Sequence, residues 1–208
     1  MDVLNKNTFT EFLLSQGVLK FGDFTLKDGS KSPFFLDFGA LATGGAFRQV
    51  GSFFNQLIEE KVGFDKIDFL HGPPYKAVML AGACALTWND KDMPCLFSRK
   101  EAKQHGEGGN FFGHQPKPGE GYVLVDDVMS SGGTKVQALE MLKEYKCLAV
   151  VVGVDRQHAD GGVTAAERFT EETGVPVYSV IKLKSLCLSL DGLIEASKYQ
   201  AMKEFCGL

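Results

Sequence analysis

Long apolar runs and an excess of basic charge are both missing from this sequence of 208 residues. Its longest apolar stretches, such as 147–154, are far too short to cross a bilayer, and the first residues lack the basic and apolar segments of a secretion signal. With 22 Lys and Arg against 26 Asp and Glu, the formal net charge is -4, so no general field attracts nucleic acid. We therefore expect a cytoplasmic protein that binds neither membranes nor nucleic acids.

Cysteine clusters and the common nucleotide-binding motifs are also missing. The five cysteines are far apart and form neither a CxxC pair nor a metal-ligand pattern, which predicts reduced, buried thiols and no metal site built from side chains. No GxxxxGK[ST] sequence occurs, which excludes a Walker A loop, and no GxGxxG follows a strand-like segment, which argues against a dinucleotide site.

The apolar residues are instead distributed as in a single α/β domain covering residues 1–208. Hydrophobic residues make up 44% of the chain, which is enough for one sizeable core. Strand-like and helix-like segments alternate, and the strands are nearly all apolar, which is typical of a mainly parallel sheet covered by helices on both faces. The predicted strands are 67–70, 94–98, 122–125, 148–154 and 177–183, and the predicted helices are 8–16, 46–62, 76–89, 134–145, 163–173 and 193–205.

An antiparallel hairpin is predicted before this sheet. The β-rich segments 21–26 and 32–38 flank Lys27-Asp28-Gly29-Ser30, in which Asp-Gly favours a tight turn. Ligands of parallel sheets bind beyond the carboxyl ends of the strands. We therefore expect the functional residues in the loops after positions 70, 98, 125 and 154.

The segment from Tyr122 to Lys135 carries the strongest chemical signal. An apolar strand is followed by Asp126, Asp127, Val128 and Met129, and then by Ser130-Ser131-Gly132-Gly133-Thr134 at the start of a helix. Small residues let backbone N–H groups approach a phosphate, and the helix N-terminus adds partial positive charge. Carboxylates are acceptors that suit a vicinal diol. The segment predicts a site for a sugar phosphate, whereas a turn with a helix cap and a solvated strand end is the plainer alternative.

This segment resembles the 5-phosphoribosyl-1-diphosphate (PRPP) binding motif of the type I phosphoribosyltransferases. Three further stretches, FTLKDGSKSPFF at 24–35, GPPYK at 72–76 and RKEAKQHGEGG at 99–109, resemble the orotate phosphoribosyltransferase family. The resemblance runs in matching order from about Phe9 to Arg156. Pro74, where a small residue is more usual, and His71 before the glycine depart from the pattern without removing a ligand-binding group.

The resemblance implies a type I phosphoribosyltransferase fold, in which residues 1–40 form a hood that binds the base and residues 41–208 form the core. It also implies a mobile loop at 99–113. Its part from Arg99 to Gly109 is too polar for core and too rich in glycine for a stable helix. A flexible cationic loop can close over a departing diphosphate and exclude water. A solvated charged loop with no such role is the alternative.

Site residues follow from the resemblance position by position. Catalysis is assigned to Lys103, His105 and Asp127. PRPP is expected to contact Lys27, Tyr75, Lys76, Arg99, Lys100, Lys103, His105 and the run from Asp126 to Thr134. Orotate is expected to contact Phe35 and Leu36 through their backbone, Ser130 at the loop edge, and Arg156, whose guanidinium suits a carboxylate.

The implied reaction is transfer of the phosphoribosyl group of PRPP to N1 of orotate, giving orotidine 5′-monophosphate and diphosphate in pyrimidine biosynthesis. Mg²⁺ is expected to arrive with PRPP and diphosphate rather than in a protein cage. A homodimer is also implied, with the 99–113 loop acting in the neighbouring subunit's site. Two alternatives remain at this stage: a phosphoribosyltransferase for another base, such as a purine, and a non-catalytic PRPP-sensing regulator.

Overall fold

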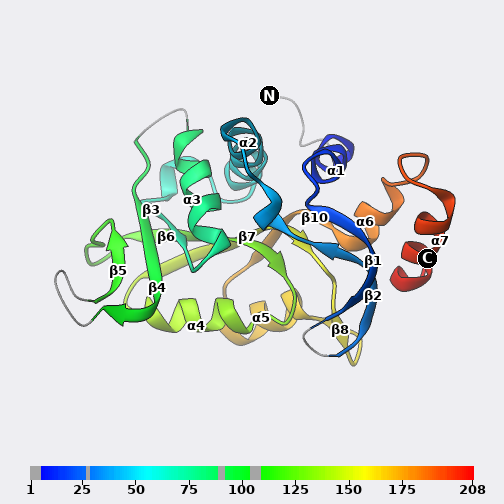
Figure 1. The fold of residues 1–208 in the computed structure, drawn as a ribbon. Coiled ribbons are helices and arrows are strands. Elements are labelled where there is room, and N and C mark those ends of the chain that lie inside the picture. Colours follow the sequence, from blue (N-terminus) through cyan, green and yellow to red (C-terminus); the bar gives the residue numbers. More distant parts are fainter. Residues whose placement is uncertain (1–5, 27–28, 89–91, 104–108) are drawn as a thin grey trace.

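A six-stranded sheet with strand order β10-β7-β6-β3-β4-β5 forms the centre of the protein (Figure 1). The structure is a computed structural model that describes residues 6–26, 29–88, 92–103 and 109–208, with the backbone alone for residues 102, 103 and 160. The strands are β3 (Phe69–Gly72), β4 (Cys95–Lys103), β5 (Gly109–Gly113), β6 (Gly121–Met129), β7 (Lys146–Asp155) and β10 (Val177–Lys182). Neighbouring strands are parallel except β4 and β5, which confirms the predicted mainly parallel sheet.

Helices cover both faces of the sheet (Figure 1). One layer holds α1 (Lys6–Ser15), α2 (Gly44–Lys61) and α3 (Lys76–Leu86), and the other holds α4 (Gly133–Met141) and α5 (Ala165–Thr173). Successive side chains of β6 pack on opposite faces of the sheet. Val123 belongs to the core cluster that contains Phe54, whereas Leu124 belongs to the cluster that contains Phe169. This alternation follows from the period of two in a β-strand, and it decides below where the acid pair points.

An antiparallel hairpin lies beside the end of the sheet, as predicted. It consists of β1 (Leu19–Thr25) and β2 (Lys31–Leu36), followed by the short 3-10 helix η1 (Phe38–Ala40). Phe34 is buried and its ring meets Phe205 of α7 (Ala196–Cys206) edge to face, with centroids 5.3 Å apart. Phe38 packs so closely on β7 that a Cβ at Gly153 would lie 2.4 Å from its Cζ. The hairpin is therefore fixed to the rest of the protein by two aromatic side chains, Phe34 on β2 and Phe38 directly after it.

The strand that carries the acid pair is longer than predicted. We expected a strand over 122–125, but β6 continues to Met129 because its pairing with β7 continues to Asp155. Asp126 and Asp127 are thus strand residues, and the loop begins only at Ser130. Polar side chains concealed this extension, since strand prediction relied on apolar runs.

Residues 99–113 were predicted as an irregular loop, and the structure corrects this for the part it describes. β4 continues to Lys103 and β5 spans Gly109–Gly113, with Ser98 opposite Phe111 and Lys103 opposite Gly109. β5 is mostly exposed, so the hairpin does not need the apolar alternation that identifies a half-buried strand. Residues 104–108, and with them His105, lie outside the described residues.

Smaller elements were not predicted. They are η2 (Phe64–Lys66), the two-residue strands β8 (Ala159–Asp160) and β9 (Val163–Thr164), and the helix α6 (Leu183–Leu188). Gly161 and Gly162, predicted as a turn, join β8 to β9 with positive φ angles of 61° and 86°, as the tight turn of a hairpin requires. In the described ranges, every helix is too short or too polar to traverse a lipid bilayer.

Candidate active site

The β6–α4 connection forms an exposed turn at the carboxyl edge of the sheet. Ser130, Ser131 and Thr134 are exposed, and Gly132 adopts a left-handed conformation with a φ of 84°. No side chain caps α4 at Gly132, so the first N–H groups of the helix are available to an anion. This is the geometry expected for a phosphate-binding turn.

The two aspartates of β6 point to opposite faces of the sheet. Asp126 lies on the α4 side, where its Oδ2 accepts a hydrogen bond from Lys135 and its Oδ1 accepts one from the Asp127 N–H at 2.9 Å. Asp127 lies on the α3 side, with its Oδ2 3.7 Å from Lys76 Nζ. The strand extension produces this arrangement, since consecutive strand residues alternate faces. Asp127 is therefore the carboxylate turned towards the cationic start of α3.

Burial and the neighbouring carboxylate of Asp126 raise the pKa of Asp127, against the opposing effects of Lys135 and Lys76. Its Oδ1 also accepts a hydrogen bond from the Val128 N–H at 2.8 Å. The carboxylate thus sits in a partly desolvated position where acceptor strength is high, which suits bonds to ribose hydroxyls.

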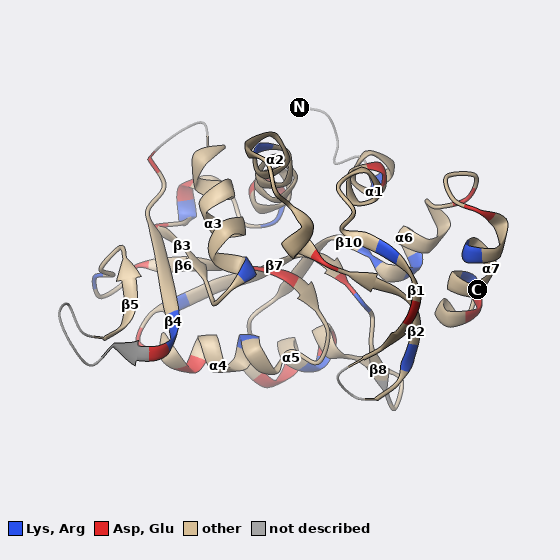
Figure 2. Ribbon diagram, in the orientation of Figure 1, with Lys and Arg blue, Asp and Glu red and all other residues tan. Residues whose placement is uncertain are grey.

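Lysine 76 connects the core with the hairpin. Its Nζ lies 3.0 Å from Asp37 Oδ1, and Asp37 Oδ2 in turn lies 2.8 Å from Lys20 Nζ on β1. The hydrogen bond from Lys20 and the charge of Lys76 lower the pKa of Asp37 to about 2 against the effect of burial. Figure 2 shows acidic and basic stretches meeting where α3 begins, close to the carboxyl end of β6.

The other residues predicted to contact PRPP lie on neighbouring elements. Tyr75 and Lys76 stand at the start of α3, with Tyr75 72% exposed. Arg99 and Lys100 lie on β4, where Lys100 is exposed and the Arg99 guanidinium carbon lies 4.9 Å from the centroid of Phe112. Because β3 and β4 are adjacent and parallel, these side chains share the carboxyl edge of the sheet with the acid pair. Lys27 lies outside the described residues, and Lys103 is described only in its backbone.

Of the residues predicted for the base, Arg156 lies close to the hairpin. The Arg156 N–H donates to the Met129 carbonyl at 3.0 Å, and its guanidinium carbon lies 5.3 Å from the centroid of Phe34. Phe34 is buried whereas Phe35 is 37% exposed, as strand alternation predicted. Arg156 thus lies between the end of β6 and β2.

Two charged residues that sequence reasoning did not assign to the site are Asp37 and Lys135. Lys135 is 3% exposed and also donates to the Val128 carbonyl at 2.7 Å. Lys135 precedes Ala138 by three residues and Leu142 by seven, and both of these are buried. This helical spacing places Lys135 on the inner face of α4, so the sequence itself contained the signal that Lys135 is buried. Asp37 gave a weaker signal, since an acid after a strand is usually a cap, and its side chain does cap η1.

His71 is the buried departure from the family pattern. Its Nδ1 lies 3.1 Å from the Leu96 carbonyl, and its Nε2 has no hydrogen-bond partner among the described residues. Burial lowers the pKa of His71 from 6.5 to about 4, against the effect of Asp126. The imidazole is therefore neutral near pH 7, with the proton on Nδ1.

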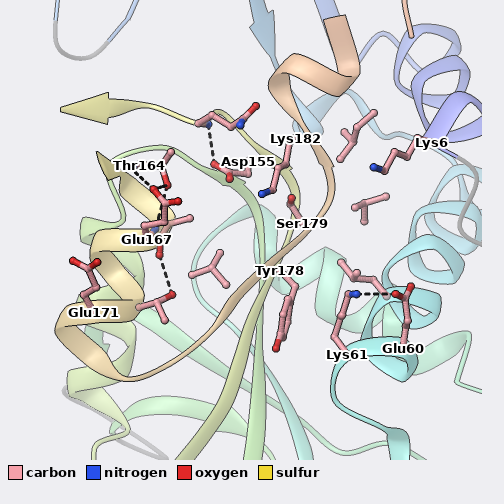
Figure 3. Close-up of a pocket in the computed structure, with 17 residues that line it drawn as sticks. Lys6, Glu60, Lys61, Asp155, Thr164, Glu167, Glu171, Tyr178, Ser179 and Lys182 are labelled. Carbon is pink, nitrogen blue, oxygen red and sulfur yellow. Dashed lines mark hydrogen bonds and ion pairs between the residues drawn. The ribbon is translucent and has the colours of Figure 1, made fainter. Parts of the chain in front are cut away.

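A separate hollow of about 860 Å³ follows β10, the strand at one end of the sheet (Figure 3). It is bordered by charged and polar side chains such as Lys6, Lys61, Glu167 and Lys182, with Tyr178 and Ser179 between them. None of the described residues predicted to bind PRPP or orotate is among its lining residues. The site predicted from the sequence is thus a surface formed by strand ends and lies apart from this hollow.

Comparisons with known proteins agree with this geometry. Residues 40–172 match the family described as phosphoribosyl transferase domain. An orotate phosphoribosyltransferase of Klebsiella pneumoniae is 38% identical over 201 residues, covering 93% of this chain and 92% of the relative. The crystal structure of the Francisella tularensis orotate phosphoribosyltransferase superposes with a TM-score of 0.78 at 31% identity, covering 95% of this chain and 96% of that one. A Leishmania donovani UMP synthase superposes with a TM-score of 0.79 at 26% identity, but this chain covers only 42% of it.

The mainly parallel sheet, with an acid pair and an uncapped helix start at its carboxyl edge, and the family match together define a phosphoribosyltransferase domain of type I. The curated relatives and the superposed crystal structure narrow this class to one family. The chain belongs to the orotate phosphoribosyltransferase family, whose reaction joins PRPP and orotate in pyrimidine biosynthesis.

Lys135→Met is expected to destabilise the protein by about 3 kcal/mol, because it leaves the Asp126 carboxylate buried without its cation. Urea unfolding measures the change. Lys143→Met, which removes an exposed pair with Glu140, is the matched control and should cost less than about 0.5 kcal/mol. Equal losses in the two variants would contradict a structural role for the buried pair.

The protein is expected to lose stability as the pH falls from 6.5 towards 4. The unfolded chain binds a proton at His71 below pH 6.5, whereas the folded chain does so only near pH 4, so acid favours unfolding by on the order of 2 kcal/mol. His71→Gln should flatten the unfolding free energy between pH 6.5 and 5. The exposed His158 serves as control, since His158→Gln should retain the wild-type profile. Identical profiles in the His71→Gln variant and the wild type would rule out this titration.

Proposed function

We propose that this chain performs the reaction of its family with the residue roles set out here: it transfers the phosphoribosyl group of PRPP to N1 of orotate, giving orotidine 5′-monophosphate and diphosphate. The observation that carries the proposal is the position of Arg156 between Met129, which ends β6, and the Phe34 ring of the hairpin. A carboxylate-binding guanidinium beside a sugar-phosphate loop suits a planar acid substrate. The cytoplasm, where PRPP is available as a metabolite, is the proposed location.

The 5′-phosphate binds the turn from Ser130 to Thr134. Exposed hydroxyls of Ser131 and Thr134 and the uncapped N–H groups at the start of α4 supply donors. The left-handed Gly132 keeps this turn tight, because a side chain there would be both strained and within 3.1 Å of Met129. Val128 and Met129 lead the backbone into the turn.

The ribose hydroxyls bind the acid pair, with Asp127 as the principal acceptor. Asp126 already accepts hydrogen bonds at both oxygens, from the Asp127 N–H and from Lys135. Asp127 keeps Oδ2 turned towards the α3 side, 3.7 Å from Lys76. A carboxylate close to the ring also stabilises positive charge that develops at the reacting carbon.

The diphosphate binds the cations at the ends of β3 and β4. Lys76 follows Tyr75 at the start of α3, and Arg99 and Lys100 extend from β4. Each charge-assisted bond from such a group contributes roughly 1.5 to 3 kcal/mol. Lys103 and His105 complete the set in the proposal, with Lys27 from the hairpin, and the permanent charge of Lys103 carries more of the effect than His105.

Orotate binds between the hairpin and Arg156. The backbone of Phe35 and Leu36 faces the ring edge, Ser130 borders it, and the Arg156 guanidinium binds the carboxylate as a bidentate donor. Positioning both substrates and stabilising the departing diphosphate account for catalysis, without a covalent nucleophile.

In the proposal, Mg²⁺ enters this site bound to PRPP. Among the described residues, no group of three or more His, Cys, Asp or Glu side chains is placed to hold a metal. Lys135 and Lys76 moreover compete for the oxygens of the acid pair. In the proposal, PRPP and diphosphate oxygens supply most of the ligands, and the ion neutralises phosphate charge when bound.

A homodimer is part of the proposal: from the loop at 99–113, Lys103 and His105 act in the neighbouring subunit's site, whereas Arg99 and Lys100 at its base stay with their own subunit. An exposed apolar surface on α2 and α3 supports it: Leu86 is 87% exposed and Met79 46%, and both border a hollow of about 330 Å³ that Phe47 also lines. Contiguous exposed apolar side chains on a soluble protein favour a contact with another chain.

Orotate is expected to be consumed when the protein is incubated with PRPP, Mg²⁺ and a panel of bases. Release of diphosphate and formation of the nucleotide are measured for orotate, uracil, adenine, guanine and hypoxanthine. Arg156→Lys, which keeps the charge but loses the bidentate geometry, should raise the KM for orotate more than that for PRPP. Turnover of a purine without turnover of orotate would refute the proposed specificity.

Subunit mixing tests the shared site. Lys103→Ala and Asp127→Asn are each expected to abolish most turnover, because each removes one component of every site. Mixed after brief unfolding and refolding, the two variants form dimers at random, so about a quarter of the wild-type activity should return through sites with both residues intact. Absence of any recovery in mixtures that contain mixed dimers would contradict action across subunits.

A further inference from the structure

Asp37 is a carboxylate that joins three parts of the fold, and neither the family resemblance nor the reaction assigns it a role. It follows β2 directly and lies 26% exposed between Lys20 on β1 and Lys76 on α3. Its Oδ1 accepts hydrogen bonds from Lys76 at 3.0 Å and from the Gly39 N–H at 3.1 Å, and its Oδ2 accepts one from Lys20 at 2.8 Å. The carboxylate is thus fixed from three directions.

This arrangement determines where the Lys76 ammonium lies. Lys76 has a long flexible side chain that is 40% exposed, and an unheld side chain of this kind samples many rotamers in solvent. Asp37 binds one of its three N–H donors, and Asp127 lies 3.7 Å away, beyond hydrogen-bonding distance. The ammonium is therefore held above the carboxyl edge of the sheet with donors left for a ligand.

The carboxylate of Asp37 stays ionised near neutral pH. The hydrogen bond from Lys20 is the largest influence that lowers the pKa of Asp37, which falls to about 2. The carboxylate consequently remains charged at any pH at which the protein functions. Its anchor on β1 also makes the position of Lys76 depend on how the hairpin packs against the core.

We infer that Asp37 is a positioning residue for PRPP, which holds Lys76 in place for the diphosphate and couples the base-binding hairpin to the diphosphate site. The inference rests on the proposed function, because Lys76 is assigned there to the diphosphate. A pre-positioned cation binds a phosphate group with less loss of side-chain freedom than a mobile one. Lys20 and Lys76 together neutralise Asp37, which limits the repulsion between its carboxylate and the ligand.

Equilibrium titration of the full-length protein with Mg²⁺ and three probes tests the inference: PRPP, inorganic diphosphate and ribose 5-phosphate. Asp37→Asn should weaken binding of PRPP and diphosphate by about tenfold, the order expected for misplacing one charged donor, and change ribose 5-phosphate binding little. Ribose 5-phosphate lacks the group that Lys76 binds. A general disturbance of the fold would weaken all three probes alike.

The Lys76→Met background shows whether Asp37 acts through Lys76. There, Asp37→Asn should cause no further loss of PRPP affinity, because the residue that it positions is gone. Asp68→Asn is the matched control: Asp68 accepts the Gly121 N–H at 2.7 Å, so the variant also loses a carboxylate hydrogen bond, but it should keep wild-type affinity for all probes.

Three results would overturn the inference: unchanged or tighter PRPP binding in Asp37→Asn, equal losses for the three probes, or equal losses in the presence and absence of Lys76. These results are independent of the base-panel assay. A protein that binds PRPP normally but ignores orotate refutes only the proposed base, whereas a protein that does not bind PRPP refutes both proposals.

Discussion

The neutralisation of carboxylates at one edge of the sheet is the constraint on which the site depends. Three aspartates, Asp37, Asp126 and Asp127, lie where a highly charged anion is proposed to bind, and unpaired acids would repel it. Lysines from other elements offset these charges: Lys135 of α4 pairs with Asp126, Lys20 of β1 pairs with Asp37, and Lys76 of α3 lies between Asp37 and Asp127. The edge can therefore present acceptors for hydroxyl groups beside donors for phosphates.

The alternation of side chains along β6 directs Asp126 and Asp127 to different lysines. If the strand ended at Val125, the acid pair would lie in a loop with no fixed direction. Because β6 stays paired with β7 to Met129, Asp126 faces the α4 layer and Asp127 the α3 layer, and each meets its own lysine. The burial of Lys135 at 3% exposure indicates that its pair with Asp126 is chiefly structural, which leaves Asp127 as the more accessible acid.

The same strand pairing connects the proposed phosphate turn with the hairpin that is proposed to bind the base. Met129 lies opposite Asp155 in the register, so the next residue, Arg156, donates its N–H to the Met129 carbonyl. From there its guanidinium reaches Phe34. Asp37, three residues further along the hairpin segment, reaches back to Lys76. The hairpin is thus tied to both sides of the site, by an aromatic contact on one side and an ion pair on the other.

The order of elements and the chemistry of single segments were determined by the sequence. Apolar runs and glycine signals identified most of the strands and helices, and Ser130 to Thr134 predicted a phosphate-binding turn, because these patterns depend on neighbours in the chain. Pairings between distant segments depended on tertiary structure alone: the extension of β6, the hairpin of β4 and β5, and the contacts of Lys135 and Asp37. Charge pairing is set by the packing of elements far apart in sequence, so the local pattern can place Lys135 on the inner face of α4 but cannot name its partner.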